Sequence, residues 1–351
     1  MHFLTSIGVI LAVTGILLIV ILKSPLKISD KLLIAILSCF VLKFLLDEWQ
    51  LLTGSQVFSV FAAMFGMSTI ATCGWYIKYL TDESEGFGWR QLLIYSPLVL
   101  LFLLTLAVLP WHLAAMYQTP AVRYVLLLMI ALIIYYFYFC IRMLQKHKQL
   151  IRQNYSGVSG SITINWMVII ISLQIAEFLL KGVLSNVFGD TNNALQVITN
   201  EYCFIIETFL LVVLGIWQKS IPVFIPPAEK AGQTPLQPGD LKRYLLRIEK
   251  FMTEEKPYLD PELTIEKLSD LTRIRKLSLS QTLNKGLNKN FFTFIKEYRI
   301  KHVEDELKNK TSEKRTIMDI AYGSGFNSKT GFNRAFKEVT GKTPTEYLGE
   351  G

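Results

Sequence analysis

Hydrogen-bond donors and cations gather on one face of a short segment near the carboxyl end of the chain. If residues 328–339 form a helix, this face carries hydroxyl, amide, ammonium and guanidinium groups, and it contains no acid before Glu338. In the major groove of DNA, Arg and Lys bind guanine, Asn binds adenine, and Ser or Lys contact phosphates. The candidate DNA-binding residues of this segment are Asn327, Ser328, Lys329, Thr330, Asn333, Arg334 and Lys337.

The elements that must position this face are predicted to be a helix, a turn and a second helix. Ile317, Ile320 and Ala321 recur at helical spacing, and the stretch 323–325, Gly-Ser-Gly, interrupts the pattern. Apolar residues then return at positions i, i+3, i+4 and i+7 of the second helix, as Phe332, Ala335, Phe336 and Val339. The pattern by itself also fits an ordinary amphipathic hairpin of two helices whose polar face is simply solvated.

The run IAYGSGFNSKTGFNRAFKEVTGKTPTEY resembles the second helix-turn-helix of the AraC family of bacterial transcription regulators. The family signature consists of GF, then F-x-R-x-F-K, then G-x-T-P-x-x-Y, and this chain matches it at Gly325, Phe326, Phe332, Arg334, Phe336, Lys337, Gly341, Thr343, Pro344 and Tyr347. The resemblance extends from Leu241 to Tyr347. It implies a sequence-specific regulator with two helix-turn-helix motifs and double-stranded DNA as partner. Neither catalysis nor a cofactor is expected.

The first helix-turn-helix is expected at about residues 265–287, and it departs from the family pattern. Arg273 stands where the family has a turn glycine, and Arg275 stands where it has a capping Ser or Thr. The turn must therefore differ in detail or carry strain, because glycine adopts positive φ easily and Ser caps a helix start. We expect this half to anchor the DNA backbone through Arg273, Arg275, Lys276, Ser280 and Gln281.

A helix over residues 291–308 is predicted to join the two halves. Its core candidates are Phe294, Ile295, Tyr298, Val303 and Leu307. About 18 residues at about 1.5 Å each give a rod of about 27 Å, which can hold two helices near one DNA repeat of about 34 Å apart. From Thr264 to Thr345 there are 17 Lys and Arg against 9 Asp and Glu, a difference of +8 that equals the charge of the whole chain. A basic domain gains DNA affinity through counterion release.

Composition indicates a membrane protein outside this region. The 351 residues are 51% hydrophobic and 18% charged, and the mean hydropathy is +0.37. Seven apolar runs are each long enough to suggest a membrane span, at about 20 residues for a full crossing. They cover residues 3–22, 32–46, 57–80, 92–109, 122–141, 162–184 and 194–217. A cleaved signal peptide is the alternative for the first run, but no basic segment precedes it and no A-x-A site follows it.

The loops between these runs predict an orientation. Basic residues recur in every second loop, for example at Lys23, Lys27 and Arg142, whereas residues 110–120 contain no Lys or Arg. This alternation places the amino terminus outside and the carboxyl-terminal domain in the cytoplasm, at the bacterial cytoplasmic membrane. The prediction agrees with a cytoplasmic DNA-binding region, which was inferred independently.

Several ionisable residues interrupt the apolar runs. Lys43 with Asp47, and Glu177 with Lys181, are spaced four apart and can neutralise each other within one helix. Glu207 has no nearby cation in the sequence. Because a charge in mid-bilayer costs about 2.5–3.5 kcal/mol on insertion scales, we hypothesise that Glu177 and Glu207 line a polar pocket that receives a small-molecule or peptide signal.

Cysteine and histidine give no sign of a metal or nucleophile site. The four cysteines, Cys39, Cys73, Cys140 and Cys203, lie far apart within apolar runs, and the four histidines are scattered. Buried thiols are the preferred interpretation, since the spacing suits neither a disulfide framework nor a metal.

The predicted organisation is all-α. A transmembrane sensor-like domain (1–219) is followed by a Pro-rich linker (220–240) and an AraC-type DNA-binding domain (241–351). An amphipathic segment at 241–252 is expected to pack on that domain or to pair with a second copy in a homodimer. The leading interpretation is a membrane-bound transcription regulator. The alternative is a membrane receptor or transporter whose helix-turn-helix tail binds proteins, and a membrane enzyme lacks any supporting motif.

Overall fold

A computed structural model of the chain describes residues 2–54, 56–81, 86–112, 120–156, 164–188, 193–218, 238–308 and 315–349. These described residues are helical or lie in turns, and the β-type pairing among them is a single antiparallel bridge between Tyr155 and Thr264. The chain divides into two compact units, residues 1–147 with 164–221, and residues 148–163 with 222–351. Residues 148–163, which lie between two apolar runs, thus belong to the second unit. The sequence had assigned them to the first domain.

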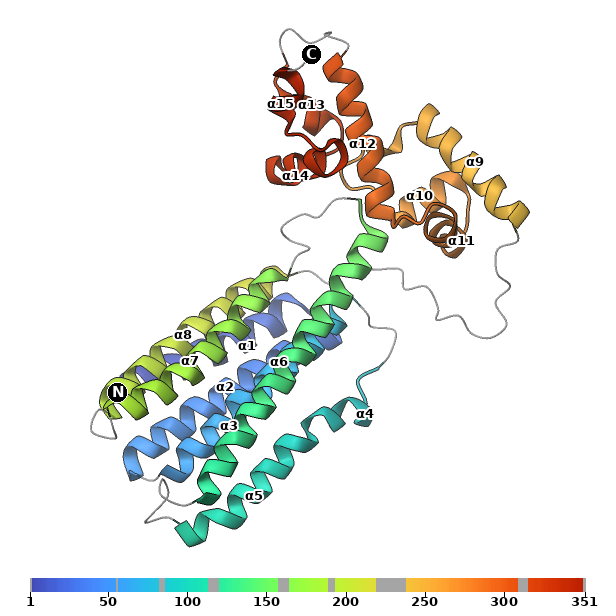
Figure 1. Cartoon of the computed structure of the whole chain (residues 1–351). Helices are drawn as coiled ribbons and strands as arrows, with labels where there is room; N and C mark the ends of the chain where they lie inside the picture. The colour runs from blue at the N-terminus through green and yellow to red at the C-terminus, as the bar shows by residue number, and fades with distance from the viewer. Residues whose placement is uncertain are drawn as a thin grey trace. The chain divides into compact units, whose positions relative to one another are not determined.

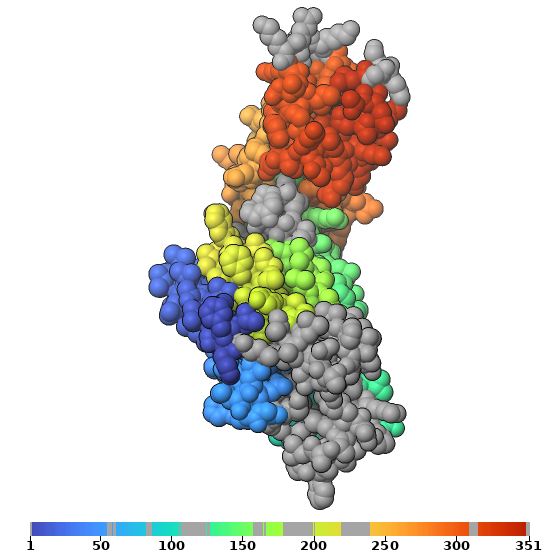
Figure 2. All heavy atoms as spheres, turned by 90° about the vertical axis from the view of Figure 1, so that its left-hand side faces the viewer, coloured from blue at the N-terminus to red at the C-terminus, as the bar shows by residue number. Residues whose placement is uncertain are grey.

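The first unit is a bundle of long helices, and the described part of each of the seven apolar runs lies mostly within one of them (Figure 1). The elements are α1 (His2–Leu22), α2 (Ile28–Thr53), α3 (Gln56–Tyr79), α4 (Trp89–Leu92), η1 (Leu93–Tyr95), α5 (Ser96–His112), α6 (Pro120–Asn154), α7 (Asn165–Phe188) and α8 (Asn193–Trp217). Within the bundle α2 packs against α3, and α1 contacts both α2 and α8. Figure 2 shows α1 and α8 side by side on one face.

Close contact between α1 and α8 depends on a small residue. A Cβ atom added to Gly15 would lie 2.2 Å from a methyl carbon of Val212, so a larger side chain would push the two helices apart. The outer faces of the bundle remain apolar, for example at Phe3 and Ile21 of α1 and Leu100 of α5. Exposed apolar surface of this kind is typical of a face that contacts lipid or another protein.

Two helices in the described part of the chain are long and apolar enough to cross a membrane, His2–Leu22 and Leu127–Asn154. By length and composition of the described helices, the prediction of seven spans is therefore not supported. In α2 the reason is visible in the sequence, because Asp30, Lys31, Lys43, Asp47 and Glu48 interrupt its run of apolar residues. The seven runs are confirmed as helices, which is a weaker statement than seven spans.

The second unit contains nine further helices and turns among its described residues: α9 (Pro238–Glu254), η3 (Pro257–Leu259), α10 (Ile265–Thr272), α11 (Lys276–Gln281) with the π-helical turn η4 (Thr282–Gly286), α12 (Phe291–Lys308), α13 (Ile317–Gly323), α14 (Lys329–Thr340) and α15 (Pro344–Gly349). It has two separate cores. Phe291, Phe294 and Ile295 of α12 belong to the first core, while Ile300 and Val303 belong to the second. One helix therefore joins both halves, as the sequence predicted.

The amphipathic helix at the start of this unit packs within the chain. Ile248 and Met252 of α9 are fully buried in the first core, and Tyr244 and Phe251 lie against it. Residues 220–237 of the predicted linker lie outside the described residues. The last three residues of the predicted linker, 238–240, belong to α9 instead. This helix begins at Pro238, a residue type that suits the first turn of a helix.

Candidate nucleic-acid interface

Helix α14 turns its two faces to different environments. Phe332, Ala335 and Phe336 are buried in the second core. The donor and cation residues predicted from the sequence are all exposed on the other side, and we call them the α14 polar face: Asn327, Ser328, Lys329, Thr330, Asn333, Arg334 and Lys337. The helical period that buries the aromatic rings therefore also fixes which side chains face outward.

The start of α14 is held by a side-chain cap. The Oγ atom of Ser328 accepts a hydrogen bond from the backbone N–H of Gly331 at 3.2 Å. A Cβ atom at position 331 would lie 2.9 Å from this Oγ atom. Glycine inside a helix normally costs about 1 kcal/mol relative to alanine. Here it leaves room for the cap, a use that the sequence did not reveal.

The turn before α14 needs glycine at one position for two reasons. Gly325 has φ +89°, and an added Cβ atom would lie 2.5 Å from the carbonyl oxygen of Tyr258. The preceding Ser324 is fully buried, donates to the Ile320 carbonyl at 2.7 Å and lies 3.0 Å from Nδ1 of His302. The turn is therefore fastened both to α12 and to the loop around Tyr258.

Helix α13 begins with a capping box. The Oγ1 atom of Thr316 accepts from the N–H of Asp319 at 3.2 Å, and the Asp319 carboxylate accepts from the N–H of Thr316 at 2.9 Å. Hydrogen bonds from the side chain and backbone of Thr316 lower the pKa of Asp319 below its usual value. At the start of both α13 and α14, a side-chain oxygen therefore accepts a hydrogen bond from at least one otherwise free backbone N–H group.

The first half is constructed less favourably. Arg273 ends α10 in the left-handed region, with φ +52°, so the turn that lacks the family glycine carries strain. Arg275 precedes α11 and makes no side-chain cap. Arg273 and Arg275 are exposed, Gln281 is partly exposed, and Lys276 forms an ion pair with Glu266. Ser280 was predicted on this surface, but it is buried, with 5% of its area exposed, because the short α11 runs directly into the π-helical turn η4.

Two cations of α12 lie inside the domain, which no pattern in the sequence indicated. Lys296 is buried beside Glu338 of α14, with 3.1 Å between Nζ and the carboxylate. Arg299 is only 2% exposed. Its Nε donates to the Tyr258 carbonyl and its Nη2 to the Asp260 carbonyl, both at 2.7 Å. The basic excess of the region is thus partly internal.

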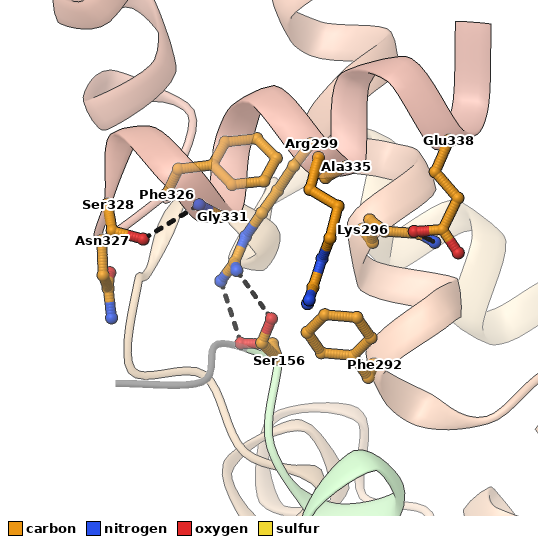
Figure 3. A pocket seen from close by; sticks show the side chains of 11 residues that line it. Ser156, Phe292, Lys296, Arg299, Phe326, Asn327, Ser328, Gly331, Ala335 and Glu338 are labelled. Carbon is orange, nitrogen blue, oxygen red and sulfur yellow. Dashed lines mark hydrogen bonds and ion pairs between the residues drawn. The ribbon is translucent and has the colours of Figure 1, made fainter. Parts of the chain in front are cut away.

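Arg299 also binds a residue far away in the sequence. Its Nη1 and Nη2 atoms donate to the carbonyl oxygen and the Oγ atom of Ser156, each at 2.9 Å (Figure 3). Burial lowers the pKa of the Arg299 guanidinium to about 10, against the opposing effect of Asp260, so the group stays charged at neutral pH. A small cavity of about 80 Å³ lies between α12 and α14 next to this contact, and Asn327, Ser328 and Arg334 line it.

The acids proposed for a signal site lie in the first unit. Glu207 of α8 is fully buried, and neither carboxyl oxygen has a hydrogen-bond partner among the described residues. Glu177 of α7 is buried too. The predicted pair of Lys43 and Asp47 is present at 2.8 Å, and Lys43 also contacts Glu201 at 3.2 Å. Lys181 is the predicted partner of Glu177, but its side chain is not among those that the structure describes.

No group of His, Cys, Asp and Glu among the described residues could hold a metal ion. The cysteines are free, and Cys73 and Cys140 are buried. Cys39 and Cys203 are partly buried, which agrees with the interpretation of these thiols as small apolar side chains.

Comparison with known proteins finds similarity in the second unit. The sequence profile of a helix-turn-helix domain matches residues 268–350. An uncharacterized HTH-type transcriptional regulator of Staphylococcus aureus is 33% identical over 89 residues, which are 25% of this chain and 12% of that protein. No solved structure matches the chain. The carboxyl-terminal region therefore contains a helix-turn-helix domain, which confirms the coarser part of the resemblance predicted there.

Proposed function

We propose that this protein is a membrane-bound, sequence-specific transcription regulator that acts without catalysis. The observation that carries the proposal is the α14 polar face. Its seven donor and cation residues are exposed together, and the opposite side of the helix is locked into a core by Phe332 and Phe336. A rigid helix with this chemistry fits the major groove, where Arg and Asn distinguish bases.

The test is selection of DNA by the full-length chain in lipid nanodiscs. The chain is incubated at low salt with a random-sequence library of duplexes, and enrichment of a shared motif is expected. Arg334→Ala should lose the preference for that motif. Arg247→Ala is the matched control, because Arg247 is an exposed arginine of α9, away from the polar face. If no motif is enriched, the proposal fails.

The first unit is proposed to be a multi-span domain of the bacterial cytoplasmic membrane, with the amino terminus outside and the carboxyl-terminal domain in the cytoplasm. Two helices of spanning length and apolar outer faces support it. Reporter fusions at the loops test this orientation. A periplasmic reporter should be active after residue 115, and a cytoplasmic reporter should be active after residue 219. The opposite pattern would overturn the orientation.

Glu177 and Glu207 are proposed to form the site where the signal is received. Burying the Glu207 carboxylate without a hydrogen bond is costly, and ionisable groups inside membranes usually serve function. Glu207→Gln keeps the shape and removes the charge, so it should abolish the response in a reporter strain. Immunoblotting must show unchanged protein level. An unaltered response at equal level would disprove the role.

The competing function is a membrane receptor or transporter whose tail binds another protein. The strained turn at Arg273 and the uncapped start of α11 favour this alternative for the first half. The DNA selection decides between the two. Binding that is lost in Arg334→Ala and depends on sequence supports the regulator, whereas indifference to sequence supports the protein-binding tail.

A further inference from the structure

Tyr155 and Ser156 lie between α6 and α7 in the sequence, and both contact the helix-turn-helix domain of the second unit, called the helix-turn-helix unit below. The N–H of Ser156 donates to the Leu263 carbonyl at 3.1 Å, and its Oγ donates to the same oxygen at 2.6 Å. Tyr155 forms the antiparallel bridge with Thr264, the residue that caps α10. This short piece of chain therefore adds a β-type contact to the loop that leads into the first half. We call residues 155–156 the docking segment.

Ser156 is also a principal ligand of the buried guanidinium of Arg299. That group makes four hydrogen bonds, and two of them end on the carbonyl oxygen and Oγ of Ser156. The other two end on the loop at Tyr258 and Asp260. Without Ser156, Nη1 would lose the partner that the structure shows for it. An arginine with available donors is a common ligand for phosphate oxygens.

The docking segment lies beside the polar face. Ser156 lines the same cavity as Asn327, Ser328 and Arg334, the side chains proposed to contact DNA. In Figure 3 the Arg299 guanidinium extends to Ser156, and Asn327 and Ser328 lie at the amino-terminal end of the helix that carries Gly331 and Ala335. The two oxygens of Ser156 occupy the guanidinium much as two phosphate oxygens would.

We propose that the docking segment is an intrachain inhibitor, which lowers the DNA affinity of the helix-turn-helix unit while it is bound and raises that affinity when it leaves. The inference rests on the proposed DNA-binding function and adds a way in which DNA binding is regulated. The segment follows α6 directly, and α6 contains one of the two helices of spanning length. A change at the end of α6 therefore acts on the docking segment through the covalent chain.

The first experiment locks the segment in place. The double variant Tyr155→Cys, Thr264→Cys puts two thiols on a bridged antiparallel pair, whose Cα atoms lie about 4.5–5.5 Å apart, within disulfide range. The full-length chain in nanodiscs is oxidised, and its affinity is measured for a duplex enriched by wild type. We expect about tenfold weaker binding, restored by dithiothreitol. Each single cysteine variant, treated alike, controls for the lost cap and the native thiols.

The second experiment releases the segment. Ser156→Pro removes the N–H that binds Leu263 and should raise the affinity about tenfold, because a larger fraction of molecules becomes competent. Ser156→Ala keeps this N–H and loses only the hydroxyl bonds, so about threefold is expected. Hydrogen exchange of residues 258–264 should increase in the same order.

The results separate the inference from the function beneath it. If the locked and reduced forms bind the duplex equally, or if the locked form binds more tightly, the inhibitor role is overturned while the regulator stands. If no chain, locked or released, prefers the enriched duplex over a scrambled one, the DNA-binding function itself has failed. Increased exchange at 258–264 with unchanged affinity would make the segment a structural tether only.

Discussion

The two halves of the helix-turn-helix domain share a helix but differ in how they are held. In the second half, Thr316 and Ser328 cap both helices, and Gly325 occupies the left-handed turn. In the first half, Arg273 takes the left-handed turn, and Arg275 leaves α11 uncapped. Capped helices and a relaxed turn hold side chains in fixed positions, which base recognition requires. We therefore propose that the second half selects sequence and the first half anchors the backbone.

The largest effect is expected at the turn of the second half. Gly325→Ala puts a Cβ atom at positive φ, 2.5 Å from the Tyr258 carbonyl, and should cost about 3 kcal/mol or more of domain stability. Gly323→Ala is the matched control, since its Cβ atom would meet nothing within 4 Å. Hydrogen exchange on the full chain measures both. Equal protection in the two variants would remove the special role of this turn.

The next prediction separates sequence selection from anchoring. Arg334→Ala should weaken binding to the selected duplex by about 1–3 kcal/mol, or roughly five- to 150-fold, with little change for a scrambled duplex. Arg275→Ala should weaken binding to both duplexes alike and reduce the salt slope by about one. Fluorescence anisotropy over a salt series measures this. Sequence-dependent loss in Arg275→Ala would erase the distinction between the halves.

Strain in the first turn is tested by comparing two substitutions at one site. Arg273→Gly and Arg273→Ala remove the same charge, but only glycine relaxes the left-handed conformation. We expect the glycine variant to be about 1 kcal/mol more stable than the alanine variant. Denaturant dependence of hydrogen exchange in residues 265–287 gives the difference. Identical stability would show that Arg273 carries no strain.

The caps can be exchanged between the halves. Ser328→Ala should destabilise α14 by about 1 kcal/mol, and Arg275→Ser should stabilise α11 by about 0.5–1 kcal/mol by adding the missing acceptor. Exchange rates at the first turn of each helix report the change. If Arg275→Ser gives no protection, the start of α11 does not have the geometry of a helix cap.

The smallest effect concerns pH in the second half. Burial lowers the pKa of His302, which lies beside Ser324, below its usual 6.5. The unfolded chain then binds the proton more tightly than the folded domain does. Stability from this group is complete above about pH 6.5 and declines as pH falls through that value. His302→Gln should flatten the dependence of the exchange rates between neutral pH and about pH 5.5, and an unchanged slope would assign it to other groups.

The sequence predicted the second half well, because local rules decide it. The apolar period of residues 332–339 places the polar face opposite, and the structure shows both faces where they were expected. Ser280 failed because α11 is short and runs into a π-helical turn, so its buried side could not be derived from spacing alone. The seven apolar runs predicted helices correctly. How many of them are long and apolar enough to be spans depends on the charged residues within each helix, as α2 illustrates.

By itself, the sequence determined the helices, the exposed face of α14 and the turns that need glycine or lack it, because these depend on neighbours within about four positions. Only the tertiary structure decided which acceptors the buried cations contact. Lys43 meets Glu201 across 158 positions, and Arg299 meets Ser156 across 143. A buried charge takes whatever acceptor the packing brings to it, and no local pattern in the chain specifies which one that will be.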